Sequence, residues 1–169
     1  LDNSAQRAAS FSKKGIKIFF HPGASSQERR ITENEYDLFF SLNKQLIEKV
    51  YFLEEDKIEL REEQRASWAS SVKFLNSFSP FPAVNRLEII KTLKQCDLAI
   101  CSHSGVYHMA VYLGLPTILL CDEIETRYLW PSKNLLHLRP GRPILRGLKE
   151  FLSAQGLEEL INKNGNSCS

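Results

Sequence analysis

The sequence predicts an α/β fold, a Rossmann-like open parallel sheet with helices on both faces. Short apolar runs alternate along the chain with stretches whose apolar residues recur at helical spacing, which indicates strands and helices in turn. One run, in Asp97–Cys101, is continuously apolar after its aspartate, as central parallel strands are. The 169 residues, of which 43% are hydrophobic and 25% charged, suffice for the core of one globular domain.

The first part of the chain predicts two strands with a helix between them. The expected divisions are a linker over 1–15, a domain over 16–165 and a tail over 166–169. The run IKIFF (Ile16–Phe20) predicts a buried strand that His21–Gly23 ends in a tight turn. Thr32, with Glu35 three residues later, is a capping-box signature and predicts a helix start. The second strand is expected at Val50–Leu53.

The rest of the chain continues the alternation. A helix is expected from about Ile58 to Leu75, and after a break at Ser77–Pro82 another helix begins with Asn85 and Glu88. The remaining expected elements are strands at 97–101, 116–121 and 135–138, and helices at 105–113, near 145–152 and at 157–161. Gly114 is expected to end the helix before the strand at 116–121.

Charge and hydropathy exclude some classes of function. The formal net charge is +2, and no stripe of lysine and arginine with interleaved aromatic residues is present, so we expect no nucleic-acid partner. The longest apolar run, Leu115–Cys121, is too short to cross a bilayer, and the start shows no signal peptide. Because the first residue is Leu1 and not methionine, we expect a fragment, a processed product or a chain with its front removed.

The cysteines predict a reducing compartment. None of the four belongs to a C-x-x-C pair, and Cys96, Cys101 and Cys121 lie beside or inside apolar stretches. We interpret these three as buried free thiols, with metal binding or disulfides as the alternatives.

Two strand-to-helix loops carry residues suited to a ligand. In parallel sheets ligands bind beyond the carboxyl ends of the strands, and both the G-x-G-x-x-G fingerprint and the P-loop pattern are absent. The first loop offers close backbone approach at Gly23, the hydroxyls of Ser25 and Ser26, and the guanidinium of Arg29, which suits phosphate. The alternative is an exposed polar loop whose arginines pair with nearby glutamates.

The second loop, SHSG, precedes the helix expected at 105–113. Ser104 is the expected N-cap and Gly105 the first helical residue, so exposed N–H groups and the positive end of the helix dipole favour an anion. His108 lies one turn in, where it could donate a hydrogen bond to a phosphate or a hydroxyl; the alternative is a partly buried, satisfied imidazole. Tyr107 and Tyr112 suit either a stacked base or the core, and we place Met109 and Leu113 in the core.

Together the two loops resemble a known family. HPGASSQERR and, some eighty residues later, CDLAICSHSGVYHMAVYLGLPTILL are similar to the carboxyl-terminal half of the glycosyltransferase family 9 enzymes, the heptosyltransferases of lipopolysaccharide core assembly. The family pattern is a His/Pro-Gly-Ala-Ser turn with a basic residue, then Asp-Ser/Thr-Gly, two residues, His, and an Ala-rich helix ending in Gly-x-Pro-Thr. The resemblance runs from about Ile16 to Pro131.

The resemblance implies the carboxyl-terminal half of a GT-B fold and an inverting, metal-independent transfer from a nucleotide-diphosphate-sugar donor, with ADP-heptose as a candidate. It implies that residues of both loops contact the diphosphate. These residues are Gly23, Ser25, Ser26, Arg29, His103, Ser104, Gly105 and His108. It also implies an amino-terminal acceptor domain that carries the general base, a glycolipid acceptor, and a cytoplasmic location with a peripheral association at the inner membrane.

The sequence departs from the family at two positions. His103 stands where the family has an aspartate, so an acceptor-only carboxylate is replaced by a ring that can be neutral or cationic. Arg29 is followed by Arg30 and Ile31, where the family often has lysine and then tryptophan. The alternatives are therefore a catalytically degenerate nucleotide-sugar-binding module, favoured by His103, and another GT-B enzyme such as a sugar-nucleotide epimerase. No catalytic residue is assigned.

Overall fold

A computed structural model describes residues 15–23, 44–54, 72–76, 82–120, 132–138, 144–157 and 159. In these ranges a sheet of six parallel strands has the order β3-β2-β1-β4-β5-β6. The strands are β1 (Ile16–His21), β2 (Ile47–Glu54), β3 (Val72–Asn76), β4 (Leu98–Cys101), β5 (Thr117–Leu120) and β6 (Leu135–Leu138). The helices are the 3-10 turn η2 (Lys44–Leu46), α4 (Pro82–Leu93), α5 (Gly105–Tyr112) and α6 (Ile144–Ala154). The predicted α/β class is therefore confirmed.

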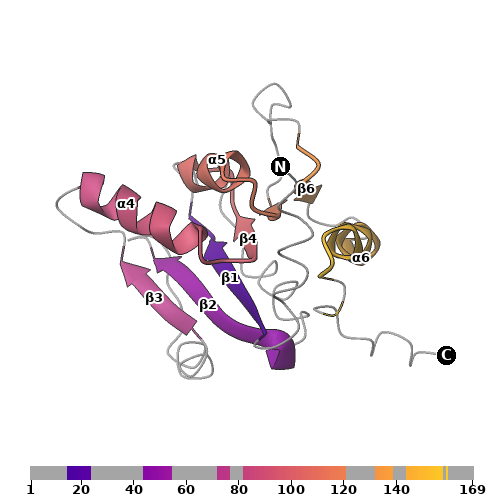
Figure 1. Ribbon diagram of the computed structural model, residues 1–169. Helices are drawn as coiled ribbons and strands as arrows, with labels where there is room; N and C mark the ends of the chain where they lie inside the picture. The colour runs from indigo at the N-terminus through magenta and orange to yellow at the C-terminus, as the bar shows by residue number, and fades with distance from the viewer. Residues whose placement is uncertain are drawn as a thin grey trace.

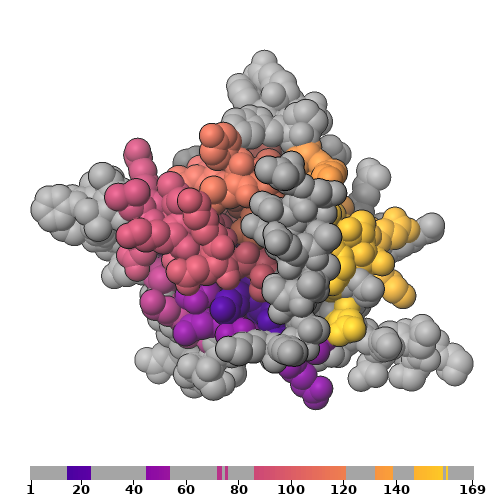
Figure 2. Space-filling view, in the orientation of Figure 1, coloured from indigo at the N-terminus to yellow at the C-terminus, as the bar shows by residue number. Residues whose placement is uncertain are grey.

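Two hydrophobic clusters cover the two faces of the sheet. Successive strand side chains point to opposite faces, so Phe19 joins one cluster while Ile18 and Phe20 join the other. Apolar side chains of α4 and α5 pack on the Phe19 face, and those of α6 pack on the opposite face. Figure 1 shows α4 and α5 together over the sheet and α6 apart from them. In the space-filling view α4 and α5 form one continuous surface, and α6 again lies separately (Figure 2).

The strand order contains one reversal of direction. The chain runs outward from β1 to β3, crosses through α4 to β4 beside β1, and then runs outward again to β6. In open α/β sheets of this doubly wound kind, ligands bind outside the carboxyl ends of the two strands where the order reverses, which here are β1 and β4. The loops after β1 and β4 meet at that point.

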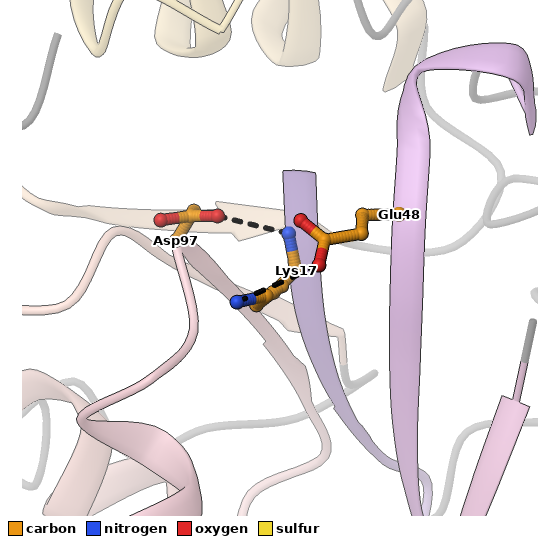
Figure 3. A network of polar contacts seen from close by, with 3 residues as sticks. All are labelled: Lys17, Glu48 and Asp97. Carbon is orange, nitrogen blue, oxygen red and sulfur yellow. Dashed lines mark hydrogen bonds and ion pairs between the residues drawn. The ribbon is translucent and has the colours of Figure 1, made fainter. Parts of the chain in front are cut away.

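The amino ends of β1 and β4 are joined by a polar network (Figure 3). The Lys17 N–H donates to Asp97 Oδ2 at 2.9 Å, and the Asp97 N–H donates to the Lys17 carbonyl at 2.8 Å. The Lys17 ammonium lies 3.6 Å from Glu48 Oε1 on β2, a partly exposed ion pair of small energetic value. The network holds β1 and β4 in register at their amino ends, opposite the carboxyl ends where His21 and Cys101 lie.

Gly114 ends α5 as the sequence predicts. Its φ of +69° lies in the left-handed region, which favours glycine. The N–H of Gly114 donates to the Val111 carbonyl and that of Leu115 to the Ala110 carbonyl, each at 3.0 Å, which is a Schellman motif. The turn leads directly into β5, so helix and strand are joined by a short connection.

Three predicted boundaries are wrong. The helix expected to run to Leu75 gives way to β3, because Val72 and Leu75 pack on opposite faces of the sheet, as strand residues do. α4 begins at Pro82, where the ring's fixed φ and missing N–H suit a first helical position, and not at Asn85. β2 begins at Ile47, three residues before the predicted strand, because Ile16 and Lys17 of β1 pair with Ile47 and Lys49.

Other predictions lie outside the described residues. These are the linker at 1–14, the capping box at Thr32 and Glu35, most of the helix near 58–71 and that at 157–161, and the tail. The predicted strands near 97–101, 116–121 and 135–138 and the helix at 105–113 are confirmed within one residue at each end. The domain limits at 16 and 165 stay a prediction.

Cys96 and Cys101 are buried free thiols, as expected for two of the three cysteines. Burial, with a smaller contribution from Asp97, raises the pKa of Cys96 from its ordinary 9.0 to about 12, and burial raises the pKa of Cys101 as well. Cys96 Sγ donates to the Thr92 carbonyl at 3.2 Å. Cys121 lies outside the described residues.

We expect both described thiols to resist alkylation in the folded protein at pH 8, because the thiolate is the reacting species and burial suppresses it. Peptide mapping after brief iodoacetamide treatment should show Cys96 and Cys101 unmodified, and fully modified in denaturant. The raised pKa also favours folding below pH 9, and this stabilisation is lost as the pH rises toward 12. Rapid native labelling of either peptide would contradict the burial.

Candidate functional site

The candidate site lies where β1 and β4 end side by side. His21, the last residue of β1, pairs with Cys101, the last residue of β4. Pro22 and Gly23 follow β1, and Ser102–Ser104 connect β4 to α5. Because the strand order reverses between these two strands, the residues occupy the switch point of the sheet.

Ser102 connects the two loops through two hydrogen bonds. Its N–H donates to the His21 carbonyl at 2.9 Å, and its hydroxyl donates to the Gly23 carbonyl. The side chain is completely buried, so both bonds are shielded from water. The backbone of the first loop, up to Gly23, is thus set by the position of the second.

Ser104 has the backbone of an N-cap residue but does not use its hydroxyl as one. Its φ of −149° and ψ of 174° are extended, as N-cap residues are, yet the side chain makes no hydrogen bond to the first turn of α5. Instead Ser104 Oγ lies 3.0 Å from Nδ1 of His21, whose side chain is 1% exposed. The N–H groups of the first turn are therefore not capped by this hydroxyl.

Gly105 leaves open space at the start of α5. It is exposed, and a Cβ placed on it would meet no atom of the described residues within 4 Å. Its φ is not in the left-handed region, so neither the backbone nor the packing of the described residues requires glycine here. Open space in front of a helix N-terminus allows an anion to reach the backbone N–H groups.

Three aromatic rings lie close together on and just before α5. The Tyr107 and His108 ring centroids lie 4.4 Å apart, those of His103 and His108 5.8 Å, and those of His103 and Tyr107 5.7 Å. Tyr107 is completely buried and belongs to the core, while the two histidines are partly exposed. Desolvation lowers the pKa of His108, so this ring is neutral near pH 7 and offers one N–H donor.

The arrangement suits an anion with several oxygen acceptors. Helix N–H groups, the Ser104 hydroxyl and the imidazole of His108 are donors, and the α5 dipole adds positive potential. Three of the chain's four histidines, His21, His103 and His108, gather here.

In the described ranges no group of three or more His, Cys, Asp or Glu residues could hold a metal ion. Over the same residues no helix is long and apolar enough to span a membrane.

The structure brings together five of the predicted site residues. These are Gly23, His103, Ser104, Gly105 and His108. Ser25, Ser26 and Arg29 lie outside the described residues. Sequence reasoning missed Ser102 and assigned His21 only to a turn. His21 ends β1 and Ser102 directly follows β4, so the signal that could have found them is a polar residue where each apolar run ends.

The fold and the site define a doubly wound α/β domain whose switch point carries hydrogen-bond donors. Solved structures of this fold include E. coli ADP-heptose lipopolysaccharide heptosyltransferase II, with a TM-score of 0.58, 20% identity and coverage of 93% of this chain and 52% of that chain. E. coli heptosyltransferase WaaC with ADP has a TM-score of 0.59 at 15% identity, covering 88% and 48%. A family 9 glycosyltransferase from Veillonella parvula has a TM-score of 0.50 at 15% identity, covering 94% and 46%.

The chain therefore shares its fold with heptosyltransferases and spans about half the length of these structures. No family model matches the chain, and no curated protein matches it in sequence. WaaC has also been solved with ADP-2-deoxy-2-fluoro heptose, so nucleotide and nucleotide-sugar complexes exist within this fold. The resemblance in the two loops is confirmed at the level of the fold.

Proposed function

We propose that this chain binds a nucleotide-diphosphate-sugar donor and forms the donor-binding, carboxyl-terminal half of an inverting glycosyltransferase of lipopolysaccharide or cell-surface glycan assembly. The observation that carries the proposal is the contact of Ser104 with His21 at the switch point, directly before the start of α5, the helix that carries Gly105 and His108. The same fold in heptosyltransferases, one of them solved with ADP, supports a nucleotide as the ligand.

The chemistry of the site fits a leaving diphosphate. When the glycosidic bond breaks, negative charge grows on the oxygen that the sugar leaves, and prearranged donors stabilise it without reorganisation. The first-turn N–H groups of α5 and the N–H of neutral His108 are donors of this kind. On the family resemblance, Ser25, Ser26 and Arg29 contribute further contacts from the first loop, and no metal is needed.

The remaining parts of the reaction come from elsewhere on this proposal. An amino-terminal acceptor domain supplies the general base and binds a glycolipid acceptor at the cytoplasmic face of the inner membrane. ADP-heptose is the candidate donor. His103, which stands where the family has aspartate, lies beside His108, with 5.8 Å between the ring centroids.

One observation favours a second candidate, a nucleotide-sugar-binding module without transferase activity. A carboxylate has two oxygens that accept hydrogen bonds from sugar hydroxyls, whereas an imidazole has at most one acceptor nitrogen. His103 therefore changes how the sugar is held without removing the diphosphate donors. Both candidates bind the nucleotide sugar, and only the transferase transfers the sugar to an acceptor.

Calorimetric titration with nucleoside diphosphates and nucleotide sugars tests the proposal. We expect micromolar binding of one diphosphate, weakened about tenfold in His108→Ala because a hydrogen bond to a charged group is lost. His137→Ala, on the edge strand β6, is the matched control and should bind as the parent does.

Three outcomes separate the candidates. Absence of binding by the parent chain to every member of the panel contradicts donor binding. If His108→Ala and His137→Ala weaken diphosphate binding equally, the ligand does not bind at α5. Binding of a nucleotide sugar with no transfer, in the presence of the amino-terminal half and a glycolipid acceptor, favours the binding module.

A further inference from the structure

We propose that His21 is a positioning residue, whose Nδ1–H fixes the Ser104 hydroxyl so that the hydroxyl hydrogen is donated to the bound diphosphate. The inference rests on the proposed function and adds to it a residue that acts on the ligand through Ser104. The carrying observation is the 3.0 Å contact between Ser104 Oγ and His21 Nδ1, made by an N-cap serine that leaves its own helix uncapped.

The contact admits two arrangements, which differ in what Ser104 offers to a ligand. If the hydroxyl donates to an unprotonated Nδ1, its only hydrogen is used and its lone pairs face outward. If Nδ1 carries the proton and donates to Oγ, the hydroxyl hydrogen remains for another acceptor. An anion in front of α5 repels the lone pairs of the first arrangement and attracts the hydrogen of the second.

Binding of a diphosphate therefore selects the protonated Nδ1. The chain of hydrogen bonds then runs in one direction, from Nδ1–H to Oγ and from Oγ–H to a phosphate oxygen, and each bond polarises the next. No covalent bond forms or breaks. A single hydroxyl becomes a directed donor because a second group supplies the hydrogen bond that the hydroxyl accepts.

The surroundings of His21 make this direction stable. The side chain is 1% exposed, so bulk water does not compete for Nδ1. The Ser102 N–H holds the His21 carbonyl at 2.9 Å, and β1 pairs with β4 at His21 and Cys101, which fixes the backbone on both sides. The backbone that carries the imidazole is therefore held next to the loop that carries Ser104.

Two replacements of His21 separate a donor role from a packing role. In His21→Asn the carboxamide nitrogen can occupy the place of Nδ1, whereas in His21→Gln it reaches toward the place of Nε2. A donor role predicts that ADP binds His21→Asn within about threefold of the parent and His21→Gln about tenfold more weakly. A packing role predicts the opposite order, because asparagine leaves the larger void.

A double-mutant cycle tests the path through Ser104. His21→Gln in a Ser104→Ala background should weaken ADP binding no further than Ser104→Ala alone, since the directed hydroxyl is already gone. Additive losses overturn the relay. Thermal unfolding of all variants, measured in parallel, shows which ones are folded before their affinities are compared.

Nitrogen-15 spectra of the histidine-labelled 169-residue chain give a direct readout of the proton. The His21 signals are assigned by their disappearance in His21→Gln. With ADP bound, Nδ1 of His21 should show the shift of a protonated ring nitrogen, and an unprotonated Nδ1 in the complex overturns the proposal. If the parent binds ADP and both His21 variants bind it as tightly as the parent does, His21 has no such role while the proposed function stands. If the parent binds no nucleoside diphosphate, both are overturned.

Discussion

Gly105→Leu is expected to weaken nucleoside-diphosphate binding at least tenfold while leaving the unfolding temperature within a few degrees of the parent. A Cβ at Gly105 meets no atom of the described protein within 4 Å, and the residue does not have a left-handed φ. The fold therefore tolerates a side chain there. A phosphate that accepts hydrogen bonds from the first-turn N–H groups at about 2.9 Å needs the same space, so the leucine side chain excludes it. Titration calorimetry and thermal unfolding together check the result.

The matched control is Gly147→Ala in α6. A Cβ at Gly147 would lie 4.0 Å from Leu138 Cδ2, an ordinary contact, and the residue is also helical. Alanine should stabilise this helix by about 0.5–1 kcal/mol and leave ligand binding unchanged. Gly105→Ala, which adds one methyl group, should fall between the parent and Gly105→Leu in affinity. Unchanged affinity in Gly105→Leu would show that no ligand approaches the start of α5.

Tyr107→Ala is expected to lower the free energy of unfolding by about 3–5 kcal/mol, the cost of emptying a large aromatic site in a core. Tyr107 is 0% exposed and belongs to the cluster between α4, α5 and the sheet. The centroid of its ring also lies 4.4 Å from that of His108, so removal of the Tyr107 ring removes a contact of this imidazole. Chemical denaturation measures the first effect, and ADP titration of the folded fraction should show weaker binding.

Tyr112→Ala is the control, since it removes the same side chain from the same helix. Tyr112 is 77% exposed, and replacement of an exposed residue of this kind changes stability by about 0.5 kcal/mol or less. Similar destabilisation by the two variants would mean that α5 does not pack on the sheet as described.

The strands were the most predictable part of the fold. LAIC is continuously apolar, and IKIFF is apolar except for Lys17, because both faces of the sheet are covered there, and this pattern can be read from the sequence alone. β3 was not predictable in this way. Val72 and Leu75 are three residues apart, which fits one face of a helix, and pairing with β2 decides that they point to opposite faces.

Within the candidate site, the residues on α5 were predictable because a serine, a glycine and a histidine one turn later form a local pattern. His108 is placed by helix geometry alone, whatever the rest of the chain does. The two tyrosines were not predictable. Local spacing allows either to be core, and the packing of α5 on α4 and the sheet buries Tyr107 and exposes Tyr112.

Composition, hydrophobic patterning and the two loop motifs thus determined the α/β class, most of the strands and the residues of the second loop, since all of these depend on neighbours within a few positions. The stretch from Cys101 to Pro116 is strand end, turn, helix and entry to the next strand, as its local pattern predicts. The partnership of His21 with Ser104 depends on residues 83 positions apart. It exists because β1 and β4 pair at the reversal of the strand order, and no local pattern encodes which strands become neighbours.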